Sequence, residues 1–124
     1  MKDFTTIDTN KILFKNDYFF IIKDNYPASP GHLLIISNLV RENYFELTKD
    51  EQVNLNEVIN IAKEIIEEEF SPDGYNIGMN CGEYAGQTVF HFHCHLIPRY
   101  KGDMENPKGG VRHCVGGMGY YNSL

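Results

Sequence analysis

One long amphipathic helix, with short β runs before and after it, limits what this chain can fold into. The run from Thr48 to Glu51 has the capping-box pattern, with a hydroxyl at the N-cap and a carboxylate three residues later. Apolar residues then recur at helical spacing for about twenty residues, until the breaker run 71–74. A single apolar stripe needs one partner surface, and a sheet built from the flanking β runs is the simplest one.

The β runs are short, and turn-like sequences join several of them. Residues 12–14 and 18–23 read as a hairpin, and residues 32–37 read as a strand after a loop with two prolines and a glycine. Two more strands are expected over residues 76–80 and 89–98. About five strands with one long helix predict an α+β domain with a mainly antiparallel sheet.

Length and composition predict one ordinary globular domain. The 124 residues fit a single domain, 1–124, whose glycine-rich end, residues 103–124, is expected to be an irregular arm. No apolar run approaches the ~20 residues of a membrane span, and the first residues lack an apolar signal core. Three cysteines without a Cys-x-x-Cys pair predict reduced thiols. We therefore expect a cytoplasmic protein that does not bind membranes.

Three of the five histidines, His91, His93 and His95, alternate along the last predicted strand. Strand side chains alternate between faces, so the three imidazoles are expected on one face, ~6–7 Å apart, with Phe92 and Cys94 facing the core. Imidazoles in such a row add little to packing, which favours a functional cluster. It could hold a metal such as zinc. Alternatively, one imidazole could attack phosphorus while its neighbours bind phosphate oxygens.

The residues before this cluster favour phosphate over metal. Gly86-Gln87-Thr88 offers backbone N–H groups, an amide and a hydroxyl, which are donors for an anion rather than metal ligands. Apart from Glu83, the nearby sequence lacks the carboxylates that hydrolytic metal sites often contain. The sequence therefore predicts no bound metal.

Three motifs resemble those of the histidine triad superfamily. The stretch from Gly86 to Arg99 is similar to the family signature, in which three histidines alternate with apolar residues. The run from Asp24 to His32 resembles the family's Asp-x-x-Pro-x-x-Pro-Gly-His loop, and Asn80 lies eleven residues before His91. The resemblance covers about residues 10–102, and the order of its three motifs makes it specific.

The resemblance implies an α+β fold, a homodimer, and hydrolysis or transfer at the α-phosphate of a nucleotide through a covalent nucleotidyl-histidine intermediate. Dinucleoside polyphosphates are the expected substrates. By position, His93 would be the nucleophile, His91 would orient and polarise it, and His32 would lie behind it in a relay. His95 would complete the catalytic group and contact the phosphate.

The resemblance also implies a set of nucleotide-binding residues. Asn80, Gln87 and Thr88 would contact the phosphate, Asp24 would accept hydrogen bonds from the ribose hydroxyls, and Ile22 and Leu34 would touch the base. The plainer alternatives are an Asx turn for Asp24 and a buried histidine bonded to backbone for His32. No cofactor is expected, and Mg²⁺ would enter only as the counter-ion of the substrate.

This chain also departs from the family pattern. Many bacterial members have N-terminal cysteines that help to bind zinc, and this sequence has none there. Asn80 fits the nucleotide-binding branch, whereas the loop 82–88 looks closer to the fragile histidine triad branch, so the choice between dinucleoside polyphosphate hydrolase and nucleoside phosphoramidase stays open. His95 disfavours the galactose-1-phosphate uridylyltransferase branch. A histidine-cluster metalloprotein and a nucleotide-binding protein without turnover are the alternatives from other classes.

Charge is distributed unevenly along the chain. The net charge of −6 argues against nucleic-acid binding, yet residues 99–124 carry four basic and two acidic side chains, which leaves −8 on the first 98 residues. A polyanionic substrate needs a locally positive entrance. We therefore expect the arm to lie near the active site of its own or a partner subunit, where Lys101, Lys108 and Arg112 hold the polyphosphate leaving group. A surface arm without substrate contact is the alternative.

Overall fold

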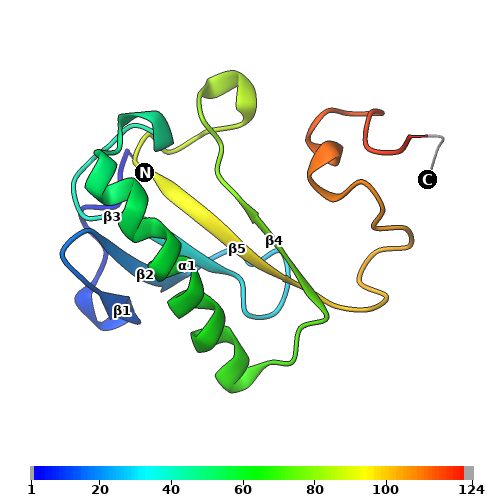
Figure 1. Ribbon diagram of the computed structural model, residues 1–124, viewed down its shortest axis with the longest axis horizontal. Coiled ribbons are helices and arrows are strands. Elements are labelled where there is room, and N and C mark those ends of the chain that lie inside the picture. Colours follow the sequence, from blue (N-terminus) through cyan, green and yellow to red (C-terminus); the bar gives the residue numbers. More distant parts are fainter. Residues whose placement is uncertain (1, 122–124) are drawn as a thin grey trace.

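The computed structural model describes residues 2–121 and contains one five-stranded antiparallel sheet with one long helix (Figure 1). This confirms the predicted α+β fold. The strands lie in the order β1-β2-β3-β5-β4, and each neighbouring pair is antiparallel. Their bounds are β1 Phe14–Lys15, β2 Phe19–Lys23, β3 Leu33–Ser37, β4 Gly74–Gly78 and β5 His93–Arg99.

The helix α1 (Lys49–Glu69) begins at the predicted capping box. The Thr48 hydroxyl accepts from the Glu51 N–H at 3.1 Å, and the Glu51 carboxylate accepts from the Thr48 N–H at 2.7 Å. Figure 1 shows α1 lying across one face of the sheet. None of the helices in residues 2–121 is long and apolar enough to cross a membrane.

The main core fills the space between α1 and the sheet. Every side chain in it is buried to at least nine-tenths, as the removal of apolar surface from water requires. The sheet contributes Phe19, Ile21, Leu33, Ile35, Cys94 and Leu96, the helix contributes Leu55, Val58, Ala62 and Ile66, and Phe92 joins them from just before β5. The predicted inward orientation of Phe92 and Cys94 is confirmed.

The opposite face of the sheet carries a second, smaller apolar cluster. Phe20, Ile22, Leu34 and Ile36 form its floor, and Phe4 packs over them. The strand register places Ile36 opposite His93 and Leu34 opposite His95. Because paired residues of antiparallel strands share a face, the histidines of β5 stand beside this cluster.

Three predicted strands are displaced. The strand predicted over residues 12–14 forms only over Phe14–Lys15, as β1. The strand predicted over residues 76–80 begins earlier, at Gly74, because Asp73 N–H already bonds to Arg99 O and starts the ladder. The strand predicted over residues 89–98 begins only at His93. Before that point the Phe92 N–H bonds to Arg41 O instead of continuing a ladder. His91 therefore precedes β5, and the prediction of three histidines in one strand is wrong at His91.

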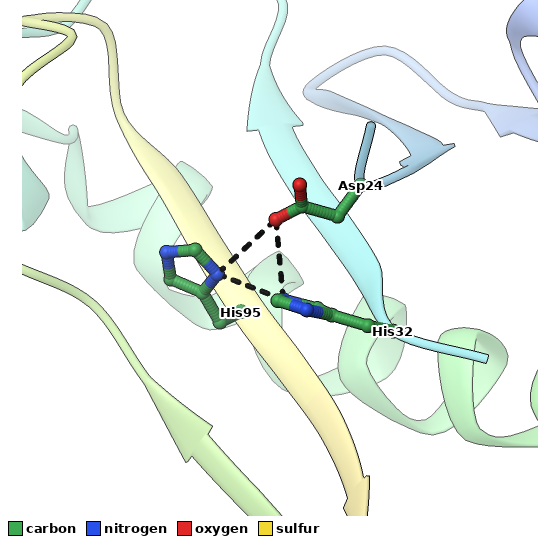
Figure 2. Close-up of side chains that lie close together, drawn as sticks. All are labelled: Asp24, His32 and His95. Atoms are coloured by element: carbon green, nitrogen blue, oxygen red, sulfur yellow. Dashed lines mark hydrogen bonds and ion pairs between the residues drawn. The ribbon is translucent and has the colours of Figure 1, made fainter. Parts of the chain in front are cut away.

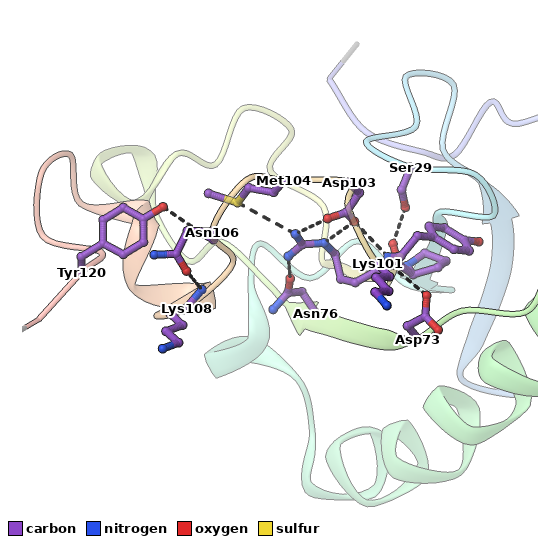
Figure 3. Close-up of polar contacts among 12 residues, drawn as sticks. Ser29, Asp73, Asn76, Lys101, Asp103, Met104, Asn106, Lys108 and Tyr120 are labelled. Carbon is purple, nitrogen blue, oxygen red and sulfur yellow. Dashed lines mark hydrogen bonds and ion pairs between the residues drawn. The ribbon is translucent and has the colours of Figure 1, made fainter. Parts of the chain in front are cut away.

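The predicted arm is irregular apart from one short 3-10 helix, η4 (Gly110–Cys114), within its described part. The arm is anchored where it leaves β5, because the Arg99 guanidinium bonds both carboxylate oxygens of Asp103 at 2.8 Å (Figure 3). Further along, η4 contacts β4. Residues 122–124 of the predicted arm lie outside the described residues.

Candidate active site

His93 and His95 project from the face of β5 that α1 leaves free. Both are half-buried, whereas their neighbours Cys94 and Leu96 are buried against the helix. The two imidazole centroids lie 5.4 Å apart in an edge-to-face arrangement. The prediction that these two histidines share a face is confirmed.

His91 has no exposed surface, and both of its ring nitrogens bond to backbone. The Phe4 N–H donates to Nδ1 at 2.9 Å, and Nε2 lies 2.7 Å from Ser37 O. A carbonyl only accepts, so Nε2 carries the proton and Nδ1 is bare. Burial lowers the pKa of His91, although the Ser37 carbonyl opposes this. The ring is therefore neutral and fixed in one tautomer.

The backbone of His91 determines the tautomer of His93. The Nδ1 atom of His93 lies 2.8 Å from the carbonyl oxygen of His91, so Nδ1 donates and carries the ring proton. In the neutral ring Nε2 then has a free lone pair. An imidazole held in this way is a competent nucleophile near neutral pH.

Asp24, His32 and His95 form a compact cluster beside His93, with their side chains pointing toward one another (Figure 2). His32 Nε2 lies 2.9 Å from His95 Nδ1 and 3.3 Å from an Asp24 carboxylate oxygen. The Ala28 N–H donates to His32 Nδ1 at 3.0 Å, so the proton of neutral His32 is on Nε2. His32 was expected behind the nucleophile, but it contacts His95 instead, because it lies just before β3, whose Leu34 pairs with His95.

The tautomer of His95 follows from that of His32. Since His32 Nε2–H donates to His95 Nδ1, the proton of His95 is on Nε2, which points away from the cluster in Figure 2. The pKa of His95 is lowered to about 4 by burial, by His93 and by His32, against the attraction of Asp24. The pKa of His32 is lowered too, because burial outweighs Asp24. At neutral pH, His95 offers one N–H to a bound anion.

This cluster does not suit a metal ion. Asp24, His32 and His95 are the one group of three such ligands found within residues 2–121. To bind a cation, His32 Nε2 would have to lose its proton to Nδ1, where it would face the N–H of Ala28. The Nε2–H of His32 instead faces two acceptors, His95 Nδ1 and the Asp24 carboxylate, which weighs against the metalloprotein alternative.

A cavity of about 980 Å³ opens beside the cluster, between β4, β5 and the arm. His32, His95 and Asn80 line it, and Asn80 is exposed, as its predicted contact with a phosphate requires. The arm adds an apolar wall of Val111, Cys114 and Val115. His93 stands next to this lining, with its other side against Phe4. Of the two β5 histidines, His95 is the one that lines the cavity.

The loop before β5 is braced by Gln87. Its side chain is 4% exposed, its amide oxygen accepts from the Gly82 N–H, and its amide nitrogen donates to Glu42 O and Val89 O. The predicted phosphate contact of Gln87 would require at least one of these bonds to open. Thr88 is exposed beside it.

The residues predicted to bind the nucleoside are placed near the site but have other partners. One carboxylate oxygen of Asp24 accepts from the Tyr26 N–H at 2.8 Å, the Asx turn of the plainer alternative. Its second oxygen faces His32. Ile22 and Leu34 are buried in the small apolar cluster, so little of either is exposed to a base.

The arm lies beside the cavity of its own subunit, but its basic residues differ in position. Lys101 lines a neighbouring pocket with Arg99. The Arg99 guanidinium already donates to Asp103 and Asn76 (Figure 3). Arg112 donates to Met118 O and stacks on the Tyr121 ring, so it serves the arm itself. A polyphosphate clamp by these residues stays a prediction.

Sequence reasoning missed Phe4, which contacts both His91 and His93. The one available signal was an aromatic residue in an otherwise polar stretch, and nothing local connects that stretch with a strand 87 residues away. Ser37 and Ala28 were missed as well, because they act through backbone atoms that every residue type has.

Comparisons with known proteins identify the family of this chain. The HIT domain matches residues 5–102. A bis(5'-adenosyl)-triphosphatase from Dictyostelium discoideum is 35% identical over 100 residues, 81% of this chain and 67% of that protein. A purine nucleoside phosphoramidase from Escherichia coli is 32% identical over 87 residues, 69% of this chain and 73% of that protein.

The fold has solved counterparts. A hypothetical histidine triad nucleotide-binding protein from Sulfolobus tokodaii superimposes with a TM-score of 0.70 at 35% identity, over 74% of this chain and 62% of that one. Fold and site thus define a protein of the histidine triad class. The chain belongs to the HIT domain family and is a hydrolase of that family.

Proposed function

We propose that this hydrolase cleaves nucleotides at the α-phosphate through a covalent intermediate on His93. The observation that carries the proposal is the bond between His93 Nδ1–H and the His91 carbonyl at 2.8 Å. It leaves the Nε2 lone pair free, and the His95 ring lies close by, with its centroid 5.4 Å from that of His93. Positioning and charge stabilisation supply most of the catalysis in phosphoryl-type transfer, and fixed imidazoles provide both.

The reaction proceeds in two displacements. His93 Nε2 bonds to the α-phosphorus while the bond to the leaving group breaks and the leaving group keeps the electron pair. Water then bonds to phosphorus, the P–N bond returns its electrons to Nε2, and a nucleoside monophosphate leaves. The proton lost by the water passes to solvent. The N–H of His95 stabilises charge on the phosphate oxygens, with Asn80 and Thr88 as further donors.

Dinucleoside polyphosphates are the proposed substrates, and nucleoside phosphoramidates are the second candidate. Similarity to a bis(5'-adenosyl)-triphosphatase supports the first class, and similarity to a purine nucleoside phosphoramidase supports the second. The two share the displacement at phosphorus and differ in the leaving group. A turnover panel with diadenosine polyphosphates, nucleoside phosphoramidates and sugar nucleotides decides between them.

The intermediate itself provides the sharpest test. The enzyme is mixed with its best substrate from the panel, quenched in base, which preserves phosphoramidates, and digested for mass spectrometry. We expect a nucleoside monophosphate adduct on His93. An adduct on another residue, or turnover with no adduct under single-turnover conditions, would contradict the proposal.

Asp24 is proposed to bind the ribose. A carboxylate can accept from both the 2′ and 3′ hydroxyls, and losing bonds to a charged acceptor weakens binding about tenfold to a hundredfold. Asp24→Ala also removes the partner of His32, so total affinity is a poor measure. The informative quantity is the ratio of the binding affinity for a ribonucleotide to that for its 2′,3′-dideoxy analogue. This ratio should fall in the variant. An unchanged ratio would exclude the ribose contact.

No metal cofactor is proposed, and Mg²⁺ acts only as a counter-ion of substrate phosphates. The proton on His32 Nε2 supports this, because that atom is not free to ligate. Turnover of a phosphoramidate, which needs no Mg²⁺ to neutralise a phosphate chain, should survive exhaustive EDTA treatment. Loss of activity that stoichiometric zinc restores would favour the metalloprotein alternative.

The chain is proposed to act as a homodimer in the cytoplasm. Large apolar side chains stay exposed on α1 and just before it, with Val53 at 63% and Phe45 at 78%. Exposed apolar groups of this size are typical of surfaces that another protein covers. Light scattering on the purified protein should give twice the monomer mass of 14.3 kDa, and Val53→Glu should lower it.

A further inference from the structure

Phe4 reaches the histidine cluster from the other end of the sequence. Its backbone N–H donates to His91 Nδ1 at 2.9 Å, and its side chain is buried. Its ring meets the rings of His91 and His93 edge to face, with centroids 5.5 Å and 5.2 Å away. Phe4 thus contacts both the proposed nucleophile and the residue whose carbonyl holds it.

The N–H of Phe4 determines which nitrogen of His91 carries the proton. If Nδ1 were protonated, two donors would face each other across a buried contact, which is costly where no water can intervene. The proton therefore stays on Nε2, which bonds to Ser37 O. The His91 ring is in this way held between the segment around Phe4 and the end of β3.

Fixing the His91 ring also fixes the His91 backbone. The carbonyl of that residue accepts from His93 Nδ1–H, so its direction determines where the free Nε2 lone pair points. His91 lies before β5 and lacks a strand ladder to hold its main chain. The ring contacts therefore hold the main chain of His91 in place, as the sheet holds that of His93 and His95.

The Phe4 ring restrains the nucleophile directly. Edge-to-face aromatic pairs are favourable beyond the apolar surface they bury. With the Phe4 ring against one side and His95 against another, the imidazole of His93 has little freedom to rotate. Small displacements of a reacting atom reduce rates strongly, by about a hundredfold for a shift of about 1 Å.

We propose that Phe4 is a positioning residue for His93: its backbone N–H fixes the tautomer of His91, and its ring restrains the nucleophile. The inference rests on the proposed function of His93. Two other titratable groups act on His91, namely Asp3 beside Phe4, which attracts a proton to the ring, and His93 on β5, which opposes it.

Four substitutions in the full chain separate the role of the Phe4 N–H from the role of the Phe4 ring. Phe4→Pro removes the N–H and the ring, Phe4→Ala removes only the ring, and Phe4→Leu keeps the N–H and much of the apolar bulk. Thr9→Pro is the control for an added proline, because Thr9 is exposed at the first position of the 3-10 helix η1 (Thr9–Lys11), where proline fits. The readouts are ¹⁵N chemical shifts of the histidine rings over pH, and separate kcat and KM values with the best substrate of the panel.

In Phe4→Pro, His91 Nδ1 loses its donor and becomes free to bind a proton. We expect the His91 ring to titrate at higher pH than in the wild type, and kcat to fall about tenfold to a hundredfold with little change in KM. Phe4→Ala should lower kcat while His91 keeps its tautomer, and Phe4→Leu should recover part of the loss. Thr9→Pro should match the wild type in both readouts.

A merely structural role would lower the melting temperature and leave the ring shifts and the kcat of the folded protein unchanged, which would overturn the proposal. If Phe4→Pro does not fold, Phe4→Ala decides, because wild-type kcat in that variant excludes the restraint on His93. The ring shifts do not depend on turnover. A wild type that hydrolyses nothing in the panel therefore refutes the proposed function, while the shifts still report whether Phe4 fixes His91.

Discussion

The two faces of β5 show how one strand serves stability and chemistry separately. Toward α1, Cys94 and Leu96 are buried in a core that a regular helix covers. On the other face, His93 and His95 are half-buried beneath irregular segments. Single hydrogen bonds that span 87 and 54 residues join Phe4 and Ser37 to His91, and one that spans 63 residues joins His32 to His95.

The difference teaches that the two faces depend on different forces. The helix face gains free energy from apolar area, which is non-directional and tolerates small shifts. The histidine face depends on which ring nitrogen carries a proton, and that is determined by individual backbone groups. Substitutions on one face should therefore change stability with little effect on the reaction, and those on the other face should do the reverse.

The largest expected effect is on the histidine face. His93→Ala removes the proposed nucleophile, and kcat should fall at least about a thousandfold. Since the side chain is half-buried outside the main core, stability in urea should change little. Nucleotide affinity, measured by calorimetry, should be retained. A variant that keeps more than about a tenth of the wild-type rate would break the comparison, because the chemistry would then not depend on this residue.

The matched substitution on the helix face is Leu96→Ala, next to His95 on the same strand. Leu96 is buried, and a leucine-to-alanine change in a core costs about 2–5 kcal/mol. Urea unfolding should show this loss, while kcat at a temperature where the variant is folded stays within about twofold of the wild type. A large loss of kcat in the folded variant would mean that the two faces are coupled.

The helix face could be predicted from the sequence because its signals are local. The capping box from Thr48 to Glu51 and the apolar spacing along α1 need no information from elsewhere in the chain. The alternation of His93 and His95 with Cys94 and Leu96 likewise follows from strand geometry.

The histidine face could be predicted only in its residue types. The burial of His91 depends on Phe4 and Ser37. A hydrogen bond between residues 87 positions apart produces no periodic pattern in the sequence from which it could be predicted. The contact of His32 with His95 follows from the pairing of β3 with β5, and sequence patterns do not determine that register. Main-chain partners such as the Ala28 N–H are invisible in a sequence, because the side chain does not take part.

An intermediate effect is expected at Gly78, which pairs with His95 across β4 and β5 and lines the cavity. A Cβ there would meet nothing within 4 Å, and the backbone is not in the left-handed region. Gly78→Val should therefore fold normally but fill the space beside His95. We expect kcat/KM to fall about tenfold, the size of a typical overpacking penalty, with a smaller loss for Gly78→Ala. Unchanged kinetics in both variants would place the substrate elsewhere.

The smallest expected effect is a loss of folding stability, which is absent at neutral pH and develops only in acid. Burial lowers the pKa of His32 and His91, and lowers that of His95 to about 4, below the usual value of 6.5. Between these pH values the unfolded chain binds more histidine protons than the folded one, so stability is fully present above about pH 6.5 and is lost as pH falls toward 4. Asp103, whose pKa is lowered to about 2 by Arg99, contributes only below this window.

Variants from both faces of β5 isolate the contribution of His95 to this loss of stability in acid. The free energy of unfolding is measured in urea at pH 7, 6, 5 and 4.5 for the wild type, His95→Asn and Leu96→Ala. His95→Asn removes one suppressed proton-binding site, so its stability should fall less steeply with decreasing pH. Leu96→Ala should lie below the wild type by a constant amount, because apolar burial does not titrate. If His95→Asn and the wild type have the same slope, protonation of His95 does not contribute to acid unfolding, and the neutral form assigned to its ring loses its support.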